Sequence, residues 1–563
     1  MSASPPLKVV LCWHMHQPYY RDAVEGEYKL PWTYLHATKD YEDMVALLEE
    51  NPAARAVVNF TPTLLEQIHD YAEQTRQYLK DGQTLRDPLL AALVAETMPE
   101  DGAARIALVR ACLRANEKRV IHRFPAFKYL AEIAHTVLKR QPYAAYFSDQ
   151  YLADILVWYH LAWLGESARH SDERIKALMQ LQHGYSLHDR QILLEVLSES
   201  MQSVIGRYRQ LAESGRVELS VTPYGHPIVP LLLDMHSTHQ AMPEAPLPQP
   251  PHYPGGDARA LWHVKEGLRV FEKFFGFRPA GCWPSEGAVS EATLALLGES
   301  GFQWAASGES VLRNSLHASG IMSQGCIHHP YRHQGSPITC FFRDDGLSDL
   351  IGFTYSDWHA EDAVGNLIHH LENIAGACHD DPDRVVSIIM DGENAWEYYP
   401  ENGYHFLTTL YQRLAEHPSI ELTTFGACIE EGLQATEMSR LIAGSWVYGT
   451  FSTWIGEAQK NRAWEFLVQA KQAFDQVVES GTLSEETRLL AERQLAICEG
   501  SDWFWWFGDY NPGESVQDFD RLYRHQLQAL YQLLDLEPPA HLNEVISLGG
   551  GGAEAGGVMR RGS

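Results

Sequence analysis

The chain has 563 residues, of which 45% are hydrophobic and 21% charged, so it is long enough for several modules or for one large barrel with insertions. Its 44 Lys and Arg residues against 73 Asp and Glu residues give a formal net charge of −29. Because this charge repels phosphate backbones and anionic lipids, nucleic acid and membrane surfaces are poor partners, and a neutral or cationic substrate is favoured.

The predicted elements begin as an alternation of strands and helices. Short apolar, β-branched runs predict strands at 8–12 and 54–60, and a long helical insertion follows over 62–214. Residues 217–221 return to a strand pattern, and the Pro- and Gly-rich sequence at 242–256 predicts a surface loop. Nothing in this first half suggests an internal repeat.

The second half continues the alternation and then becomes helical. Strands are predicted at 279–282, 304–306, 339–342 and 385–390, with helices at 258–275, 291–300, 361–375 and 405–417. This pattern favours a parallel sheet with helical crossovers, open or closed into a barrel. From about residue 429 the strand signals stop, and a helical module is predicted from 459–480, 484–498 and 516–536. The Gly-rich residues 549–563 predict a disordered tail.

The cysteines and the N-terminal segment indicate the compartment. The eight cysteines lie far apart and form no CxxC pair, so we expect neither a zinc ribbon nor a dense disulfide framework, and most should be buried free thiols. The first ten residues carry one lysine and a very short apolar run, too little for a signal peptide. No stretch approaches about 18 uncharged apolar residues. We expect a soluble, cytoplasmic protein.

Four clusters of polar residues lie where predicted strands end, which is where α/β sheets and barrels place their active sites. In the first cluster, His14 and His16 are two residues apart, so both point to the same side of an extended backbone. In the second, His226 lies in a Gly-His-Pro loop that also follows a strand. A metal site would need all three imidazoles, and hydrogen-bonded loop histidines are the alternative.

The third and fourth clusters bring carboxylates to strand ends. Glu286 follows an apolar strand and Trp283, where core packing does not explain a carboxylate, although a solvated loop residue remains the alternative. Asp391, Glu393 and Trp396 follow the most hydrophobic strand of the chain. Calcium would compete for these acids, but the spacing of an EF-hand is absent.

Together, Glu286 and Asp391 supply the pair of carboxyl groups that cleavage of a glycosidic bond requires. One carboxylate attacks the anomeric carbon, and the other stays protonated to donate to the leaving oxygen. The imidazoles can bind sugar hydroxyls, and Trp283 and Trp396 offer apolar faces for sugar rings. Desolvation by such rings would raise a carboxyl pKa toward the acid role.

These four clusters, in this order, resemble the signature regions of glycoside hydrolase family 57. The matching segments are 16–18, 225–227, 283–286 (WPSE), 391–397 (DGENAWE) and the fifth region at 445–446, 454–456 and 461–465. Further similarity covers 31–40, 342–349 and 499–506 (EGSDWFWW). The resemblance therefore spans about residues 8 to 536, and with five motifs in the same order the probability of a chance match is very small.

The resemblance implies an α/β fold, an incomplete (β/α)7 barrel with helical insertions and a C-terminal helical domain, which acts on α-glucans with retention of anomeric configuration. It implies that Glu286 is the nucleophile and Asp391 the general acid/base. The donor subsites would be lined by His14, His16, His226, Trp283, Glu393, Trp396 and Trp454. Neither a metal nor a cofactor is expected.

The expected organisation is a catalytic barrel over 1–430 with the insertion at about 62–214, a helical domain over 431–540 that completes the active site, and a disordered tail over 541–563. The DGENAWE and EGSDWFWW segments look most like the amylopullulanase or α-amylase group, and the pattern of the branching-enzyme group is not seen. The short chain favours an intracellular role on glycogen, maltodextrins or storage glucan.

The function hypothesis is a retaining hydrolase of α-1,4 bonds, with α-1,6 bonds as a further target. A 4-α-glucanotransferase is the nearest alternative, because both reactions share the glycosyl-enzyme intermediate. A metal-dependent, polysaccharide deacetylase-like hydrolase that uses the three histidines belongs to a different class. A non-catalytic glucan-binding protein is disfavoured by the presence of both carboxylates.

The substrate and the remaining aromatic residues complete the expectations. The partner is an α-glucan polysaccharide or a maltooligosaccharide, and the sequence leaves the oligomeric state open. Trp503, Trp505 and Trp506 are expected to pack the helical module onto the barrel rather than to bind sugar. Asp344 and Asp349 are expected to fix loops or to bind the edge of the substrate.

Overall fold

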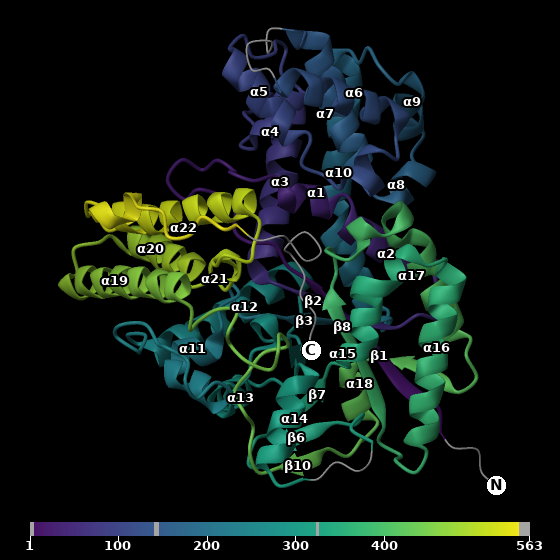
Figure 1. The fold of residues 1–563 in the computed structure, drawn as a ribbon, viewed down its shortest axis with the longest axis vertical. Coiled ribbons are helices and arrows are strands. Elements are labelled where there is room, and N and C mark those ends of the chain that lie inside the picture. Colours follow the sequence, from purple (N-terminus) through teal and green to yellow (C-terminus); the bar gives the residue numbers. More distant parts are fainter. Residues whose placement is uncertain (1–4, 140–145, 322–325, 551–563) are drawn as a thin grey trace.

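The computed structural model describes residues 5–139, 146–321 and 326–550, and this part of the chain contains one sheet of ten strands (Figure 1). The strands are β1 (Leu7–Met15), β2 (Ala56–Phe60), β3 (Val217–Val221), β4 (Gly281–Cys282), β5 (Trp304–Ser307), β6 (Tyr331–His333), β7 (Thr339–Phe342), β8 (Val385–Asp391), β9 (Ile420–Thr423) and β10 (Thr436–Met438). Their order is β10-β6-β7-β5-β4-β3-β2-β1-β8, and β9 also pairs with β1. Every pairing is parallel except that of β6 with β7.

Seven of these strands curl into an incomplete barrel. The path β7-β5-β4-β3-β2-β1-β8 returns on itself through a single parallel bridge between Arg343, just after β7, and Ser387 in β8. The backbone N–H of Asp344 donates to the carbonyl of Ser387 over 2.8 Å at this closure. The predicted incomplete (β/α)7 barrel is therefore confirmed.

The two strands that carry the densest polar clusters, β1 and β8, are neighbours in the sheet. β1 and β8 are nearly continuous apolar runs, as expected for parallel strands that are buried on both faces. Their register pairs Trp13 with Met390 and His14 with Asp391. Residues from the first and fourth clusters therefore emerge side by side at the carboxyl ends of the strands, although they are far apart in sequence.

The long helical insertion between β2 and β3 is confirmed and stands apart from the barrel at the top of Figure 1. It comprises α3 (Pro62–Asp81), α4 (Pro88–Leu93), α5 (Gly102–Ala111), α6 (Pro125–Leu138), α7 (Asp149–Trp163), α8 (Glu166–Ser171), α9 (Glu173–Leu181) and α10 (Leu187–Glu213). Two short helices that follow β1, α1 (Trp32–Ala37) and α2 (Asp40–Glu50), lie at its base. The insertion thereby forms a wall above one side of the barrel mouth.

The crossover helices and the C-terminal module also follow the predicted pattern. The crossovers include α11 (Val229–Leu233), α12 (Gly256–Phe275), α13 (Glu291–Glu299), α14 (Glu309–Ala318), α15 (Asp345–Asp349), α16 (Ala360–Ala377), α17 (Tyr404–Ala415) and α18 (Phe425–Glu430). The C-terminal module consists of α19 (Ala458–Ser480), α20 (Glu485–Cys498), α21 (Asp502–Trp506) and α22 (Gly513–Leu533). It projects from the barrel beside the insertion (Figure 1).

The structure corrects the expectation that no strand follows residue 429, and it confirms that most cysteines are buried free thiols. A strand does occur after residue 429, because β10 (Thr436–Met438) pairs with β6, and three residues are too few to give a recognisable strand pattern. Cys326 and Cys378 form a disulfide, whereas the other six cysteines are free and buried. Most of the predicted disordered tail, residues 551–563, lies outside the described residues. The predicted domain boundaries stay a prediction.

Within the described residues, no helix combines the length and the apolar character needed to cross a membrane.

Candidate active site

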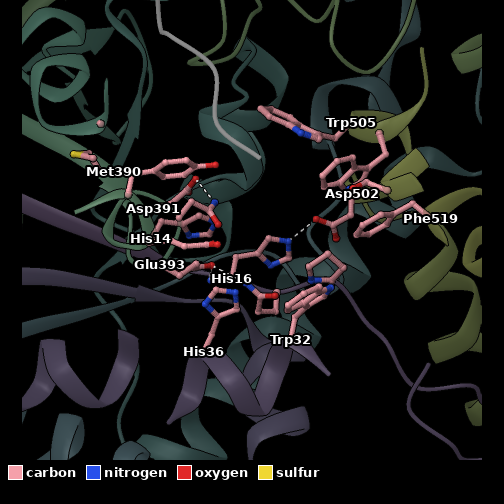
Figure 2. A pocket seen from close by; sticks show the side chains of 18 of the residues that line it. His14, His16, Trp32, His36, Met390, Asp391, Glu393, Asp502, Trp505 and Phe519 are labelled. Atoms are coloured by element: carbon pink, nitrogen blue, oxygen red, sulfur yellow. Dashed lines mark hydrogen bonds and ion pairs between the residues drawn. The ribbon is translucent and has the colours of Figure 1, made fainter. Parts of the chain in front are cut away.

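A cavity of about 550 Å³ opens at the carboxyl ends of the barrel strands, between the helical insertion and the C-terminal module. Figure 2 shows Asp391, Glu393 and His14 on the wall formed by β1 and β8, opposite Asp502, Trp505 and Phe519 from the C-terminal module. The remaining lining residues include Trp32 and His36 of α1, Arg114, Trp163, Glu286, Arg343 and Trp446. Distant segments thus meet at one site, as α/β barrels require.

Glu286 lies in the tight turn that follows β4. Its φ of 58° and ψ of 24° place it in the left-handed region, which costs a non-glycine residue on the order of 1 kcal/mol or more. The side chain is 9% exposed, and its Oε2 accepts a hydrogen bond from Trp446 Nε1 over 3.0 Å. Ser501 Oγ lies 3.5 Å from Oε1. A strained backbone therefore presents a buried, hydrogen-bonded carboxyl to the cavity.

Asp391 is the last residue of β8 and lines the cavity. Its Oδ2 accepts a hydrogen bond from Asn394 Nδ2 over 3.0 Å. Arg343 also lines the cavity, and its guanidinium is held by the Ile389 carbonyl and by Asp345 and Asp349, each at 2.7–2.9 Å. A fixed cation consequently stands near one of the two candidate catalytic carboxyls.

The two carboxyls are electrostatically coupled. Burial, followed by the charge of Asp391, raises the pKa of Glu286 to about 8, even though the hydrogen bond from Trp446 acts in the opposite direction. Burial raises the pKa of Asp391 to about 6, against the lowering effects of Asn394 and Arg343. At neutral pH the pair therefore keeps one proton, and burial favours its placement on Glu286.

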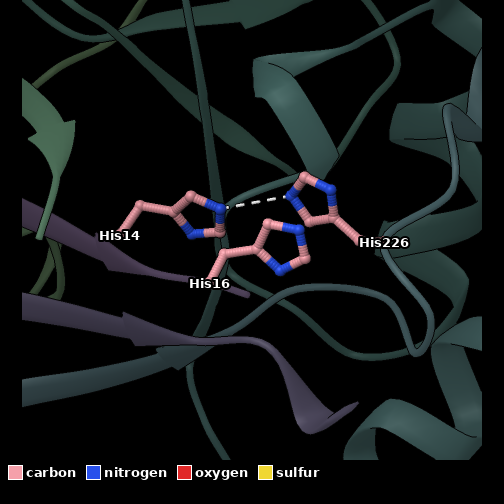
Figure 3. Close-up of side chains that lie close together, drawn as sticks. All are labelled: His14, His16 and His226. Carbon is pink, nitrogen blue, oxygen red and sulfur yellow. Dashed lines mark hydrogen bonds between the residues drawn. The ribbon is translucent and has the colours of Figure 1, made fainter. Parts of the chain in front are cut away.

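The three predicted histidines form one cluster (Figure 3). His14 Nε2 and His226 Nε2 are 3.1 Å apart, and the rings of His16 and His226 stack with centroids 3.8 Å apart. His14 Nδ1 bonds Asn59 Oδ1 at 2.7 Å, and His226 Nδ1 bonds Ser501 Oγ at 2.7 Å. Burial lowers the pKa of His14 to about 3 and that of His226 well below its ordinary value, so both imidazoles are neutral near pH 7.

The tautomers of His14 and His226 follow from their hydrogen bonds. Because Asn59 Oδ1 accepts, His14 carries its proton on Nδ1, and His226 Nε2–H then donates to His14 Nε2. His226 Nδ1 is left to accept from the Ser501 hydroxyl, so that Ser501 cannot donate to Glu286 at the same time. A proton on the histidine pair would free Ser501 to donate to an ionised Glu286. The protonation of the histidines and the ionisation of Glu286 are therefore coupled through Ser501.

The same three histidines are the candidate metal site, because one nitrogen of each lies within 4.8 Å of the others. Both nitrogens of His16 already have partners, Thr61 Oγ1 at 3.1 Å and Asp502 Oδ1 at 2.7 Å. The outer nitrogens of His14 and His226 are likewise bonded to side chains. A metal ion would have to replace the His14–His226 bond and the bond from His16 to Asp502. The hydrogen-bond network fits a neutral polar ligand without such rearrangement.

Glu393 is a third carboxyl on the wall of the cavity and is 2% exposed. Its Oε1 accepts from the His16 backbone N–H at 3.3 Å and from Gln17 Nε2 at 3.2 Å. Its Oε2 is buried with no hydrogen-bond partner among the described residues. Burial, and then the charge of Asp391, raises the pKa of Glu393 well above its ordinary value, which favours the protonated form that can donate to a ligand hydroxyl.

The three tryptophans that were predicted to line the donor subsites do not line the cavity. Trp283, Trp396 and Trp454 are fully buried and are not among the described residues that line the cavity. Trp283 packs edge-on against Trp446, and Trp396 Nε1 donates to the Gly392 carbonyl. Their predicted place in donor subsites stays a prediction, and here they support the residues that do line the cavity.

Two tryptophans assigned to packing by the sequence analysis do line the cavity. Trp505 and Trp506 of α21 line it together with Asp502, and Trp506 also stacks on Phe519 of α22, so that their expected packing role stays a prediction. Trp503 does pack, against Tyr523 of α22. The alternation of buried and lining residues over one short helix cannot be read from a run of aromatic letters.

Other residues of the site had no local sequence signal. Trp446 and Ser501 contact Glu286 although they follow it by more than 150 residues in the chain. Arg114 and Asn59 come from the insertion and from β2. Asp344 caps α15 and Asp349 holds Arg343. Both therefore fix loops of the cavity wall, which is one of the two roles expected for them. Only the resemblance had pointed to the segments that contain Trp446 and Ser501.

The charges around the cavity favour a neutral ligand. Six carboxyl groups line it, against two guanidinium groups, those of Arg114 and Arg343. The carboxyls are those of Glu286, Asp391, Glu393, Glu397, Asp502 and Glu514. Such a wall repels phosphates and uronates, while carboxyls, imidazoles and indole rings suit the hydroxyls and apolar faces of neutral sugars.

Comparisons with known proteins agree with this geometry. The model of glycosyl hydrolase family 57 matches residues 10–439. No curated protein sequence matches the chain.

Solved structures share the fold at low identity. A branching enzyme from Thermococcus kodakaraensis is 15% identical, with 94% of this chain and 90% of that chain covered and a TM-score of 0.57. An α-amylase from Thermotoga maritima is 14% identical, with coverages of 94% and 93% and a TM-score of 0.55. A 4-α-glucanotransferase from Thermococcus litoralis is 14% identical, with coverages of 94% and 60% and a TM-score of 0.52.

Proposed function

The chain belongs to glycosyl hydrolase family 57, and from that premise we propose that its cavity cleaves the glycosidic bonds of α-glucan chains with Glu286 and Asp391 as the reacting pair. The observation that carries the proposal is the coupled pair itself. Two carboxyls from the ends of different strands, the buried Glu286 and the partly buried Asp391, have pKa values raised to about 8 and about 6 in a cavity that suits neutral sugars. Such a pair holds one proton near neutral pH, and a retaining glycosidase needs one proton on its two carboxyl groups, placed on the acid.

In the proposed mechanism, a Glu286 oxygen attacks the anomeric carbon while Asp391 donates its proton to the departing glycosidic oxygen. The bond to the leaving sugar breaks, and the glycosyl group stays on Glu286. Asp391 then takes a proton from an incoming water or sugar hydroxyl, whose oxygen attacks the anomeric carbon and releases Glu286. The net configuration at the anomeric carbon is retained.

The proton must lie on Asp391 when the substrate is bound, whereas burial favours Glu286 in the empty cavity. Two features support the transfer. Trp446 Nε1–H stabilises the carboxylate form of Glu286, and a glycosidic oxygen beside Asp391 offers an acceptor for the proton there. The opposite assignment, with Asp391 as nucleophile and Glu286 as acid, is the competing mechanism.

Azide rescue of alanine variants separates the two assignments. On a glycosyl fluoride donor, whose leaving group needs no acid, Asp391→Ala should still form the glycosyl-enzyme, and azide should release an α-glycosyl azide. Glu286→Ala should react with azide directly and give the β-azide. Exchanged anomers would exchange the roles. Near wild-type turnover of starch by either variant would remove that residue from the mechanism altogether.

The finer specificity is proposed as hydrolysis of α-1,4 bonds, with α-1,6 bonds as a further target, in the manner of the α-amylase or amylopullulanase group. The signature segments at 391–397 and 499–506 support it. Transfer to a sugar hydroxyl, as in a 4-α-glucanotransferase or a branching enzyme, uses the same intermediate and is the alternative. The predicted cytoplasmic location, with storage glucan or maltodextrin as substrate, rests on the sequence alone.

Product analysis decides among these reactions. The protein is incubated separately with maltoheptaose, soluble starch and pullulan, and reducing ends and linkages are measured. New reducing ends from starch and pullulan mean hydrolysis of both bond types. Longer and shorter oligomers without net reducing ends mean transfer, and a rise in α-1,6 linkages identifies branching. No change in any substrate would contradict the proposed substrate class.

The metal-dependent, deacetylase-like alternative is favoured by one observation, the convergence of His14, His16 and His226. It leaves the coupling of Glu286 with Asp391 without a role, and it would require the hydrogen bonds of the histidines to be broken. Treatment with a chelator followed by zinc tests it on an acetylated polysaccharide and on starch. Zinc-dependent release of acetate would establish the alternative, and chelator-resistant cleavage of starch would eliminate it.

A further inference from the structure

We propose that Cys326, Cys378 and His328 form a Zn²⁺ site when the two cysteines are reduced. The group lies outside the cavity, where the segment before β6 meets the end of α16. In the structure the two sulfurs are joined as a disulfide, with their Cα atoms 5.2 Å apart. The reduced form holds two thiols in the same place, beside imidazoles that a disulfide does not need.

The positions of the donor atoms suit a tetrahedral ion. One ligand atom from each of Cys326, His328 and Cys378 lies within 4.8 Å of the others, and Cys326 Sγ is 4.0 Å from His328 Nδ1. Zinc bonds of about 2.3 Å to sulfur and about 2.0 Å to nitrogen place such ligands about 3.5 Å apart. Small side-chain movements therefore bring the three atoms onto one ion once the disulfide is open.

The second nitrogen of His328 provides an independent indication. His328 Nε2 bonds Asp344 Oδ2 at 2.8 Å, which leaves Nδ1 directed to the sulfurs. A carboxylate behind a metal-bound imidazole fixes its tautomer and orientation and is the usual partner of zinc-bound histidine. Asp344 is itself held, because its other oxygen caps the N-terminus of α15. The site thus has an outer shell as well as ligands.

A fourth ligand is at hand. Cys326, His329 and Asp381 form a second group of donor atoms that also lie within 4.8 Å of one another. His329 Nδ1 bonds Asp381 Oδ2 at 2.9 Å, and its Nε2 is buried with no hydrogen-bond partner among the described residues. His329, which is grouped with Cys326 but not with Cys378 or His328, is the candidate for the fourth position. In the described part of the chain, the six free cysteines belong to no such group.

A dithiol can supply the two electrons that reduction of the Cys326–Cys378 disulfide requires. Two electrons and two protons pass from the dithiol to the disulfide, giving two protein thiols and the oxidised, cyclic dithiol. Binding of Zn²⁺ then displaces the two thiol protons to solvent and forms two zinc–thiolate bonds. Oxidation and metal binding exclude each other at these sulfurs, so the bound zinc protects the pair from re-oxidation.

The experiment measures metal content and spectrum rather than activity. The full-length protein is reduced with a dithiol, freed of it without oxygen, loaded with Zn²⁺ or Co²⁺ and dialysed. We expect one Zn²⁺ per chain in the reduced protein and none in the oxidised protein. The Co²⁺ form should show thiolate-to-cobalt charge transfer in the near ultraviolet and the intense visible bands of a tetrahedral ion.

Variants locate the ion. Cys326→Ser and Cys378→Ser should lose the bound metal and the charge-transfer band, and Asp344→Asn should weaken Zn²⁺ binding about 10- to 100-fold. Cys112→Ser, which removes a buried cysteine with no such neighbours, is the matched control and should bind as the wild type does. A reduced wild type without stoichiometric zinc overturns the proposal, as does full zinc retention in Cys326→Ser. The spectrum of the wild type decides the matter even where a variant fails to fold.

Discussion

At the scale of single residues, the cavity is defined by carboxyl groups that cannot all be charged. Glu286 and Glu393 are buried and Asp391 is partly buried around one space, and desolvation raises the pKa of each. Placing a further negative charge among them would cost free energy that no nearby cation offsets fully, because Arg343 is already bonded to Asp345 and Asp349. The number of protons in the cavity therefore determines whether it is catalytically competent.

The pH dependence of kcat/KM should follow this count. Activity requires one proton on the Glu286–Asp391 pair, so it should fall below about pH 6, where the pair takes up a second proton, and above about pH 8, where it loses the last one. The acidic and basic limbs of this pH profile report the titration of the pair rather than that of either residue alone. Initial rates on an uncharged maltooligosaccharide across pH 4–10 measure them. A flat profile between pH 5 and 9 would contradict the coupling.

Trp446→Phe tests the hydrogen bond that stabilises ionised Glu286. The ring can still pack against Trp283, but the donor to Oε2 is lost, so the pKa of Glu286 should rise and the basic limb should move to higher pH. A lost bond to a charged group of about 1.5 kcal/mol corresponds to roughly a ten-fold fall in kcat/KM.

The matched control for this variant is Trp283→Phe, because Trp283 Nε1 is buried without a hydrogen-bond partner among the described residues. It removes an indole N–H of the same kind next to Trp446 and should leave the basic limb in place. A basic limb that stays unchanged in Trp446→Phe, or that shifts equally in both variants, would show that this bond does not set the pKa.

The sequence predicts Glu286 and Asp391 as the candidate catalytic pair because each stands at the end of an apolar run, a signal contained in a few neighbouring residues. It could not predict that Trp446 and Ser501 would touch Glu286, since those contacts depend on how the C-terminal module docks. The strained backbone of Glu286 was equally hidden, because a left-handed φ at a glutamate has no propensity signature.

At the scale of elements, a buried ion cluster joins α12 and α20 beneath the histidines. Glu499 is 1% exposed and accepts hydrogen bonds from Tyr253 at 2.6 Å, Arg259 at 2.7 Å and His263 at 2.7 Å. His263 also bonds the carbonyl of Tyr224, two residues before His226. Burial opposes the charge of Glu499, but Arg259 and His263 lower its pKa to about 2.

Glu499→Gln should lower the free energy of unfolding near pH 7 by about 3 to 5 kcal/mol, because Arg259 is left buried without its counter-charge. The pKa of Glu499 is lower in the folded chain, so its contribution is complete above about pH 4.5 and is lost as the pH falls toward 2. The difference between variant and wild type should therefore shrink below pH 4.5. Urea unfolding at several pH values measures it.

Glu492→Gln is the control for the ion cluster, since Glu492 lies 3.8 Å from Arg259 and its side chain is 20% exposed. It should change the free energy of unfolding by no more than about 1 kcal/mol. A destabilisation of Glu499→Gln that stays constant from pH 7 to pH 3 would show that packing, rather than charge, accounts for the loss.

Most of the elements that the sequence analysis missed are short, although α2 and α14, with 11 and 10 residues, were also missed. β6, β9 and β10 have three or four residues each, and α21 has five. Periodicity needs more residues than that to show, and these elements exist because their neighbours complete them. The long helices and the apolar strands β1 and β8 were predicted within a few residues, because burial imposes a pattern along their full length.

At the scale of the whole molecule, the helical insertion and the C-terminal module meet across the mouth of the cavity. Arg114 Nη2 lies 2.7 Å from Asp518 Oδ2 of α22, and its guanidinium stands 5.4 Å from the ring centroid of Trp32. Arg114, Trp32 and Phe519 all line the cavity. This ion pair links the two modules at the mouth of the cavity, a second one joins Glu66 of α3 to Arg493 of α20, and no local sequence pattern could reveal either.

Breaking this link should widen the mouth of the cavity. Arg114→Ala and Asp518→Ala should each raise KM for maltoheptaose up to about five-fold, since a partly exposed ion pair contributes at most about 1 kcal/mol, and should shift the products of starch toward longer chains. The double variant should resemble either single variant, because both remove the same interaction.

Arg521→Ala is the control: it removes the other partner of Asp518, at 2.8 Å, on an exposed side chain away from the cavity. Additive effects in the double variant, or the same product shift in Arg521→Ala, would show that the two modules are held together by other contacts and that the mouth is set by the barrel alone.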